Sequence, residues 1–496
     1  MMKKSITSIL VLLLAAGLVV SCSSTSDKDQ EKETTPGETS GAAADNGDDT
    51  AGPTADTSAL DQLKTDDFGG YTFSVLAVND AANNRHYDIQ TAGEENGDLL
   101  NDLVYNRNRA VEEKYNITLK TSNDDFNAVT EQVRQQVHGG LHDYDLYLAD
   151  SHVAKLAAEG FFADMNSIDT LGLTNPWWSQ NALQSLSVEG KVYFMTGDIN
   201  PTTMMSGGGL VFNKKLFADH DLAYPYETVR SGKWTIDALL TLTKDMSQDM
   251  NGDNAMNIED DLYSMSGWCA SSPYSFFYGM GGMMSEKNNN DIPVLRWDAD
   301  QISGIYEKLY ELIITQQSYF VTDVAKYDTN FKCFSDGHAY FNQISLLTVD
   351  RNLRDMQDDY GILPMPKYDE SQKNYASYVN AASNFAMIPS NTENASRTGM
   401  ITEALAAGAY DMVTPSLYEI ITKSRNVRDE ESAEMVSIIT SSIVFDPFYL
   451  NLLDGYSLIQ EQLIAKNANI TSAMESKRSA AEKAMEKLVE AFQSIE

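Results

Sequence analysis

The residues from Asp249 to Asp260 carry oxygen-bearing side chains at the spacing of a calcium-binding loop. At loop positions 1, 3, 5, 9 and 12 they are Asp249, Asn251, Asp253, Asn257 and Asp260. Hard cations such as Ca²⁺ prefer oxygen ligands in this arrangement. Asn254 replaces the glycine usual at position 6, and asparagine tolerates the left-handed backbone conformation better than most residues. The spacing predicts a structural calcium site, and the alternative is a surface turn rich in Asn, Asp and Gly.

Motifs of the common catalytic chemistries are absent from the sequence. It contains no His-Glu-x-x-His and no Gly-x-Ser-x-Gly, and the segment 279–282 (Gly-Met-Gly-Gly) lacks the Lys-Ser/Thr of a phosphate-binding loop. The paired carboxylates of a glycosidase cannot be singled out among 72 acidic residues. No residue pattern therefore singles out a catalytic site, and we expect no required cofactor beyond the calcium predicted above.

The first 22 residues have the pattern of an export signal. Lys3 and Lys4 precede an apolar run from Ile9 to Val20, which is shorter than the roughly 20 apolar residues of a transmembrane helix. The residues Val-Val-Ser-Cys that end at Cys22 resemble a bacterial lipobox. We expect a signal peptide over residues 1–21 and a lipid on Cys22, which would place the protein at the extracellular face of the cell membrane. A plain cleaved signal is the alternative.

The segment after Cys22 is acidic and poor in large apolar side chains. Residues 23–60 contain nine acidic residues and two lysines, so they cannot bury enough surface to offset their chain entropy. We expect a disordered tether over residues 22–66. The net charge of −36 repels nucleic acid and anionic lipid, so we expect no nucleic-acid partner.

The two remaining cysteines, Cys269 and Cys333, lie among apolar and aromatic neighbours. This setting favours buried free thiols, and a disulfide between them is the alternative in an exported chain.

Apolar periodicity predicts alternating strands and helices after the tether. Strands are expected at 71–78, 117–119 and 144–149, and amphipathic helices at 100–115 and 126–137. This order is typical of parallel α/β units with right-handed crossovers. A second series of elements follows the glycines at 207–209, and residues 470–495 form a charged amphipathic helix. About 435 residues suffice for two lobes.

Several segments, taken in order, resemble one family of transport proteins, the extracellular solute-binding proteins of bacterial ABC importers (family 1, carbohydrate type). Besides the lipobox and acidic tether, the segments are 144–150 with 160–165, 175–178 leading to 190–194, 209–217, 232–237 and 360–367. Phe212 stands where the family commonly has tyrosine, and the segment 206–209 lacks the charged residue that some sugar binders present there.

The resemblance implies an α/β, two-lobed periplasmic-binding-protein-like fold (type II) that holds its ligand in the cleft between the lobes. The N-lobe would comprise residues 67–200 and 373–428, and the C-lobe residues 201–372 and 429–496. Crossing segments are expected near 199–208, 367–378 and 426–432, with hinge closure around a carbohydrate. The implied partners are the transmembrane permease subunits of the importer, and the implied state is a monomer.

The two-lobed fold with a ligand cleft suggests candidate ligand-binding residues. Asp150 directly follows a predicted strand, where parallel sheets bind ligands, and its carboxylate can accept two sugar hydroxyls or cap the next helix. Flat aromatic rings in loops suit the apolar faces of sugars. The candidates are Asp150, Ser151, Trp177, Trp178, Asp198, Trp268, Tyr274, Tyr278, Asn342, Asn380 and Asp446.

Other functions fit the same sequence features. An exported glycan-degrading enzyme is one alternative. The same fold could instead bind a peptide or another polar solute, or serve as a surface interaction protein that has lost transport.

Overall fold

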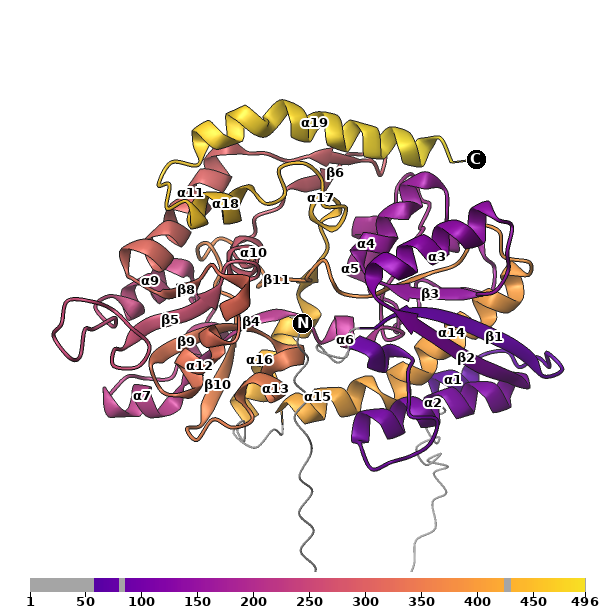
Figure 1. Cartoon of the computed structure of the whole chain (residues 1–496), viewed down its shortest axis with the longest axis horizontal. Helices are drawn as coiled ribbons and strands as arrows, with labels where there is room; N and C mark the ends of the chain where they lie inside the picture. The colour runs from indigo at the N-terminus through magenta and orange to yellow at the C-terminus, as the bar shows by residue number, and fades with distance from the viewer. Residues whose placement is uncertain (1–57, 80–84, 423–429, 496) are drawn as a thin grey trace, which may run out of the picture. The chain divides into compact units, whose positions relative to one another are not determined.

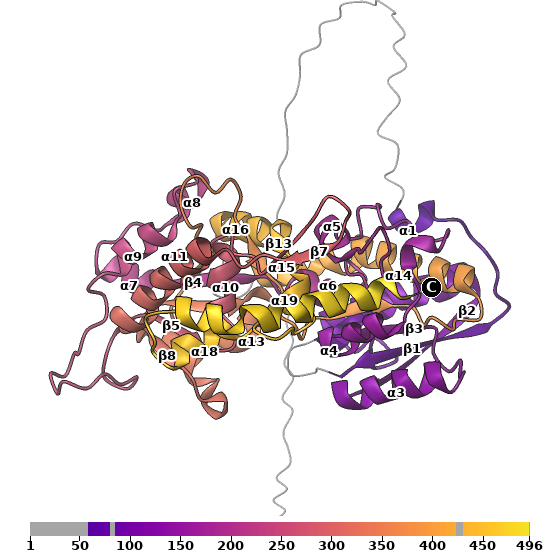
Figure 2. The ribbon, with the colours of Figure 1, turned by 90° about the horizontal axis from the view of Figure 1, so that it is seen from above.

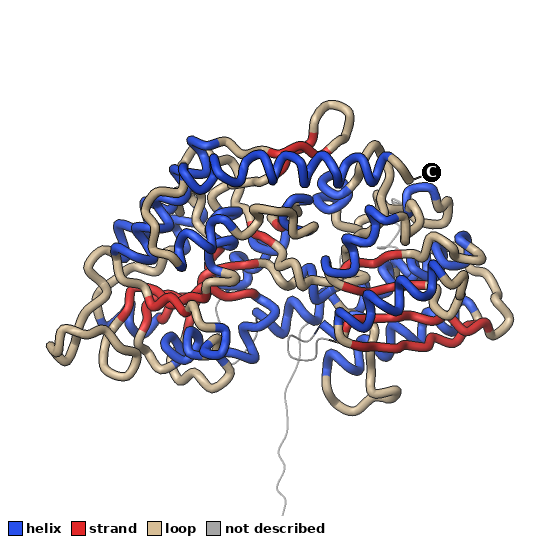
Figure 3. Tube along the Cα trace, turned by 45° about the horizontal axis from the view of Figure 1, so that its top comes forward, coloured by secondary structure: helices blue, strands red, loops and turns tan. Residues whose placement is uncertain are grey.

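A computed structural model describes residues 58–79, 85–422 and 430–495. The predicted signal peptide, Cys22 and most of the predicted tether lie outside these ranges. Within them, no helix combines the length and the apolar composition that crossing a bilayer requires. The described elements form an N-lobe and a C-lobe, each built on its own sheet (Figures 1 and 3).

The N-lobe contains a four-stranded sheet in the order β12-β3-β1-β2. Strands β1 (Tyr71–Val78), β2 (Ile117–Asp124) and β3 (Leu146–Ala149) are parallel, and β12 (Phe385–Met387) is antiparallel to β3. All four residues of β3 are buried, as expected for a parallel strand covered on both faces. The predicted alternation of strands and helices is thus observed, with one later strand added at the sheet edge.

Local capping explains where the N-lobe helices begin and end. Asp98 caps the first turn of α2 through Asn101 N, and Asn116, at φ 48°, ends that helix. The sequence offers Asp124 or Asp125 as the N-cap of α3, and in the structure Asp125 caps it through Asn127 N and Ala128 N. The N-lobe helices are α1 (Ala59–Gln62), α2 (Leu99–Tyr115), α3 (Phe126–His138), α4 (Ser151–Ala154), α5 (Gln180–Leu186), α14 (Ala395–Met412) and the 3₁₀ helices η2 (Arg85–Asp88), η3 (Lys155–Glu159) and η4 (Met165–Ser167).

The end of the predicted tether is folded, because α1 lies within residues 22–66. Asp411 of α14 accepts hydrogen bonds from Ala59 N and Leu60 N, both at 3.0 Å. The Leu60 side chain is buried. The prediction of disorder through residue 66 therefore extends too far, because this short stretch finds its partner more than 350 residues later in the chain.

The C-lobe contains a mixed five-stranded sheet in the order β10-β4-β9-β5-β8. Strand β4 is antiparallel to both neighbours, whereas β9, β5 and β8 run parallel. The strands are β4 (Gly208–Asn213), β5 (Tyr263–Trp268), β8 (Tyr319–Val321), β9 (Ala339–Ser345) and β10 (Tyr360–Pro364). The parallel pair β9 and β5 end at the same sheet edge, which is where such sheets bind ligands.

Short helices surround the C-lobe sheet. They are α7 (Lys214–Asp219), α8 (Tyr226–Arg230), α9 (Ile236–Thr243), α10 (Ser272–Gly279), α11 (Ala299–Tyr310), the π-helical turn η5 (Glu311–Thr315), η6 (Val324–Lys326), α12 (Thr329–Ser335), η7 (Leu346–Thr348), α13 (Val349–Leu353), α16 (Glu430–Ser441), α17 (Pro447–Leu450) and α18 (Leu458–Ile464).

Three segments cross between the lobes. The first contains α6 (Pro201–Met204) and enters β4, and the second contains β11 (Ser377–Tyr378) and leads to β12. Strand β11 lies at the end of the expected range 367–378, and the start of that range still belongs to the C-lobe, where Lys367 N donates to Trp234 O at 3.0 Å. Strand β11 pairs with β13 (Ile443–Val444). The third runs from α15 (Thr414–Thr422) toward α16, and part of it lies outside the described residues.

The lobes are also joined at the turn 187–193 of the N-lobe. The hairpin of β6 (Ser285–Lys287) and β7 (Pro293–Leu295) reaches this turn, where Asp291 accepts from Gly190 N at 2.9 Å. The helix α19 (Thr471–Gln493) runs from α11 and α18 to the same turn (Figures 1 and 2). Its Phe492 ring stacks on Tyr193 with 5.4 Å between centroids. We call the turn, the hairpin tip and the end of α19 the clasp.

We predict that Phe492→Ala loosens the clasp without unfolding either lobe. Removing this buried ring costs about 3 kcal/mol of packing, so amide exchange in residues 187–193 should become at least about tenfold faster. Hydrogen–deuterium exchange measured by mass spectrometry checks this. Exchange in β1 and β3 should not change, and Lys487→Ala, on the exposed face of α19, is the matched control. Unchanged exchange in the turn would contradict the role of Phe492.

Candidate functional site

A pocket of about 270 Å³ lies where the C-lobe sheet meets the second crossing segment. It is at the end of β5 and β9, next to the start of α10. Its lining residues are Ser206, Gly208, Trp268, Ser271, Tyr327, Phe331, Gln343, Ile344, Ser345, Thr348, Tyr378, Asn380 and Ala382. The pocket therefore combines a fixed sheet edge with a segment that connects the lobes.

Aromatic rings form one side of the pocket. Trp268 meets Tyr327 edge to face, with 4.5 Å between centroids. Tyr378 is backed by Tyr274 and Tyr278, whose rings stack on it at 6.2 and 6.1 Å. Rings held in this way by other rings give a rigid apolar surface.

A chain of hydrogen bonds fixes the polar floor of the pocket. Trp268 N donates to Ser272 Oγ at 3.0 Å, and Ser272 Oγ donates to Gln343 Oε1 at 3.1 Å. Ser271 Oγ donates to the same oxygen at 2.9 Å. Ser272 can approach because residue 267 is glycine, where a Cβ would come within 2.5 Å of Ser272 Oγ.

The crossing segment closes the pocket on the N-lobe side. Asn380 Oδ1 accepts from Ala382 N at 2.8 Å, which gives a tight turn. Ala381 O accepts from Ser151 N at 3.0 Å, so the start of α4 is tied to this turn. Asp150 caps α4 through His152 N, and its second oxygen is 3.2 Å from His152 Nδ1.

The pocket is uncharged although the chain is strongly acidic. None of the described lining residues is Asp, Glu, Lys, Arg or His, whereas the net charge of the chain is −36. An unpaired charged ligand would lose its hydration here without gaining a counter-ion. The arrangement therefore suits a neutral ligand with apolar faces and hydrogen-bonding groups.

The structure places some of the predicted ligand residues at this pocket. Trp268 and Asn380 line it, Tyr274 and Tyr278 support its aromatic side, and Ser151 contacts its edge through Ala381. The sequence analysis did not identify Ser206, Ser271, Tyr327, Phe331, Gln343, Ser345, Thr348 or Tyr378. A polar residue within the buried strand 339–345 was the available signal for Gln343.

Trp177 and Trp178 lie inside the N-lobe and do not line the pocket. Their indole N–H groups donate to the two oxygens of Glu403, at 2.9 and 2.8 Å. Asn175 Nδ2 and Gly172 N donate to the same carboxylate, at 2.6 and 3.1 Å. Glu403 on α14 is buried, so this carboxylate organises the loop that carries both tryptophans.

Asp198 lies beside this loop, at the start of the first crossing. Its N donates to Trp177 O at 2.8 Å, and its carboxylate accepts from Thr414 Oγ1 at 2.6 Å. Burial raises the pKa of Asp198 to about 7, because a single hydrogen bond only partly offsets the lost hydration. Asp198 thus ties the first crossing to the start of α15.

Asn342 and Asp446 are buried and engaged with protein groups. Asn342 Nδ2 donates to Ser266 Oγ at 2.8 Å inside the C-lobe. Asp446 accepts from Tyr278 Oη, Ser285 Oγ, Met284 N and Phe448 N. Burial raises the pKa of Asp446 although these bonds oppose the shift. Neither residue lines the pocket.

The predicted calcium loop is an exposed turn held by its own hydrogen bonds. Asp249 accepts from Gly252 N and Asn254 N, and Asn254 has the left-handed φ of 63° expected for position 6. Among the described residues, no three His, Cys, Asp or Glu side chains gather as a metal ion requires. Calcium binding stays a prediction from sequence. The prediction of buried free thiols is confirmed, because Cys269 and Cys333 are unpaired and buried.

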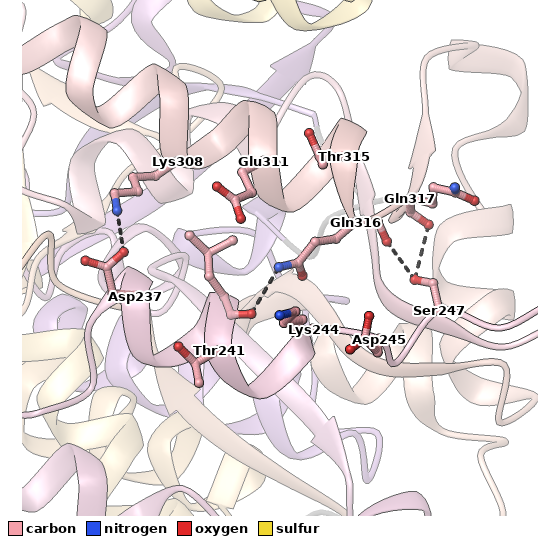
Figure 4. Close-up of a pocket in the computed structure, with 11 residues that line it drawn as sticks. Asp237, Thr241, Lys244, Asp245, Ser247, Lys308, Glu311, Thr315, Gln316 and Gln317 are labelled. Atoms are coloured by element: carbon pink, nitrogen blue, oxygen red, sulfur yellow. Dashed lines mark hydrogen bonds and ion pairs between the residues drawn. The ribbon is translucent and has the colours of Figure 1, made fainter.

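Two other hollows are less suited to a ligand with apolar faces. One, of about 750 Å³, lies on the C-lobe between α9 and the π-helical turn, and is lined by groups such as Asp237, Lys308 and Glu311 without an aromatic ring (Figure 4). The other, of about 790 Å³, is lined by α5 and by residues 372–376, with Tyr375 as its single ring.

Comparison with solved structures places this fold among binding proteins. M. tuberculosis UspC aligns at 11% identity over 83% of this chain and 100% of its own, with a TM-score of 0.56. A cyclo/maltodextrin-binding protein complexed with maltotetraose aligns at 13% identity over 85% and 96%, with a TM-score of 0.53.

A third structure is the galacto-N-biose-/lacto-N-biose I-binding protein of the ABC transporter from Bifidobacterium longum, in complex with lacto-N-biose. It aligns at 11% identity over 86% of this chain and 97% of its own, with a TM-score of 0.51. No family model matches the sequence, and no curated protein sequence matches it. The chain therefore has the two-lobed α/β fold of periplasmic sugar-binding proteins, as the resemblance implies.

We predict that Glu403→Gln destabilises the N-lobe. The amide nitrogen would face two of the four donors, so buried N–H groups would lose their acceptor, at a cost of about 2–4 kcal/mol. Urea unfolding followed by tryptophan fluorescence checks this. Glu113→Gln, on the exposed face of α2, is the control. Equal stability of the two variants would contradict the role of Glu403.

We also predict a pH-dependent gain in stability for Asp198→Asn. The raised pKa means that the folded wild-type protein loses stability as pH rises from about 4 through 7, because ionisation is easier in the unfolded chain. The variant has no such loss, so its advantage should reach up to about 4 kcal/mol above pH 7. Thermal unfolding at pH 5 and pH 8, with exposed Asp355→Asn as control, measures it. An advantage that does not grow with pH would refute this assignment.

Proposed function

We propose that this protein is the lipid-anchored, extracellular substrate-binding subunit of an ABC importer. It captures a carbohydrate, of oligosaccharide type, by hinged closure of its lobes and delivers it to the transmembrane permease subunits. It acts as a monomer and is not an enzyme.

The pocket at the lobe junction carries this proposal. Four aromatic rings, those of Trp268, Tyr327, Phe331 and Tyr378, border a space that otherwise presents amides, hydroxyls and no charge. Sugars have apolar C–H faces and neutral hydroxyl groups, so such a surface buries their faces and hydrogen-bonds their edges. A peptide or an ionic solute would require counter-charges that the lining does not provide.

The solved structures with the same fold support the ligand class. One of them holds maltotetraose, and another is a transporter component that holds lacto-N-biose. The pocket volume of about 270 Å³ is slightly below the roughly 300–1,000 Å³ typical of small-molecule sites. A longer saccharide would place its end unit here and extend its remaining units along the junction of the lobes.

The export and anchoring parts of the proposal come from the N-terminal sequence. The basic start, the apolar run and the lipobox that ends at Cys22 support export and lipidation. An acidic segment between the lipid and the folded part would keep the binding lobes away from anionic lipid.

Calorimetric titration of residues 58–496 with neutral oligosaccharides tests the function. We expect saturable binding of a neutral sugar, no binding of uronic acids, and a smaller radius of gyration by solution scattering when the sugar is bound. Hydrolysis of a glycan by the purified protein would instead support the enzyme alternative. Absence of binding to every sugar would refute carbohydrate capture.

Within this proposal, we predict that Trp268→Ala weakens binding about 10–100-fold. The variant removes an aromatic face worth about 1.5–3 kcal/mol to a sugar ring. Trp268→Phe should retain most of the affinity because it keeps a flat ring. Tyr224→Ala, which removes an exposed C-lobe aromatic that does not line the pocket, controls for loss of surface area. Unchanged affinity in Trp268→Ala would exclude this ring from the site.

A further inference from the structure

Two amide side chains at the pocket have their oxygens occupied by protein donors. Gln343 Oε1 accepts from Ser271 Oγ and Ser272 Oγ, at 2.9 and 3.1 Å. Asn380 Oδ1 accepts from Ala382 N at 2.8 Å. Both residues line the same pocket, one from β9 and the other from the second crossing.

The orientation of each amide is set by chemistry. A backbone N–H can only donate, so the Asn380 atom that faces Ala382 N must be the oxygen. Ser272 Oγ already accepts from Trp268 N, and its buried hydroxyl hydrogen needs an acceptor. If Gln343 were flipped, that hydrogen would have no acceptor. The amide oxygens therefore face the protein, and the NH₂ groups are left for other partners.

The two NH₂ groups have no hydrogen-bond partner among the described residues. Gln343 is only 4% exposed, and the pocket is the space that its side chain borders. The neighbouring hydroxyl groups offer a ligand only their lone pairs, because their hydrogens are already donated to the protein. Ser345 Oγ donates to Ser206 O at 2.9 Å, and Thr348 Oγ1 donates to Ser345 O at 3.1 Å. The donors that the described lining leaves without a protein partner thus include Gln343 Nε2, Asn380 Nδ2 and the indole Nε1 of Trp268.

We infer that Gln343 and Asn380 determine ligand specificity by donating hydrogen bonds to acceptor oxygens of an uncharged sugar. This inference rests on the proposed function and assigns the polarity of that same site. The described lining contains no carboxylate. The pocket therefore differs from a site whose carboxylates accept hydrogen bonds from sugar hydroxyl groups. The acceptor is either the carbonyl of an acetamido group or a hydroxyl or ring oxygen.

Donor-to-acceptor substitutions test the inference. Gln343→Glu and Asn380→Asp keep the oxygen that the protein holds and replace the NH₂ group with a carboxylate oxygen of similar size. At pH 7 each variant should bind the preferred sugar about 10–100-fold more weakly, because two acceptors then face each other. Gln343→Glu should also lower the thermal stability at pH 7, because its side chain is 4% exposed and no counter-ion lines the pocket, so affinities are compared at a temperature where every variant is folded. Gln317→Glu, in the other C-lobe hollow, adds the same charge away from the pocket.

Measuring the affinity of Gln343→Glu at acidic pH distinguishes a donor role of residue 343 from a purely structural role. When the introduced carboxyl group is protonated, it carries an O–H donor again, so part of the affinity lost by Gln343→Glu should return near pH 4.5. Wild-type protein and Gln317→Glu, titrated at both pH values, give the baseline. Equal or tighter binding by Gln343→Glu at pH 7 would overturn the inference, because residue 343 would then be accepting a hydrogen bond from the ligand.

Matched sugar pairs separate the two kinds of acceptor. Cellobiose and N,N′-diacetylchitobiose differ only by acetamido groups, as do lactose and N-acetyllactosamine. Tighter binding of the acetylated member that is lost in Gln343→Glu assigns a carbonyl acceptor. Tighter binding of the other member, with the same loss, assigns a hydroxyl or ring oxygen. If both variants bind the sugar as tightly as the wild-type protein does, only the donor assignment is refuted. If the wild-type protein binds no neutral sugar, the proposed function is refuted as well.

Discussion

One buried carboxylate, that of Asp88, positions the two crossing segments that reach the pocket. It accepts from Thr202 N and Thr202 Oγ1 in the first crossing, at 3.1 and 2.8 Å, and from Asn384 Nδ2 after the second, at 2.9 Å. Burial raises the pKa of Asp88 although these bonds stabilise the charged form. The segments that enter β4 and leave β11 are thus fixed to the N-lobe at one point. The pocket lies where both continue into the C-lobe.

A second set of buried polar groups gives the pocket its chemical character. Ser271 and Ser272 begin α10 and turn their hydroxyls toward Gln343, while Trp268 N donates to Ser272. Such networks hold side chains in one rotamer because each unmade bond in the interior is costly. The pocket thereby stays neutral within a chain of net charge −36.

Elements with local signals could be predicted from the sequence, and long-range partners could not. The bounds of β1 and an aspartate cap of α3 at residue 124 or 125 follow from periodicity and capping, which involve neighbouring residues. The roles of Trp177 and Trp178 depend on Glu403, which is 226 and 225 residues away. Two adjacent tryptophans in a loop look the same in sequence whether they face a ligand or a buried carboxylate.

The same distinction applies within the site. The sequence predicts Trp268 and Asn380 as ligand residues because an aromatic loop and a polar residue near a strand suggest a ligand, and both line the pocket. Gln343 escaped prediction because it follows Asn342 in one buried strand, and the sequence does not show which of two adjacent amides reaches the cavity. The structure resolves this, because Asn342 Nδ2 is taken by Ser266 and Asn330, whereas the NH₂ group of Gln343 is not taken by any described residue.

The placement of the two donor amides also bears on closure. Gln343 belongs to the C-lobe sheet, whereas Asn380 lies on a crossing segment whose next residue, Ala381, is bonded to Ser151 at the start of α4. A ligand shifts a conformational equilibrium only by the difference in its affinity for the two states. A sugar held by Gln343 alone would bind equally well at any lobe angle. In the proposed function, a sugar that bonds both amides would gain free energy only when the crossing is correctly placed against the sheet, and this difference would favour a closed arrangement.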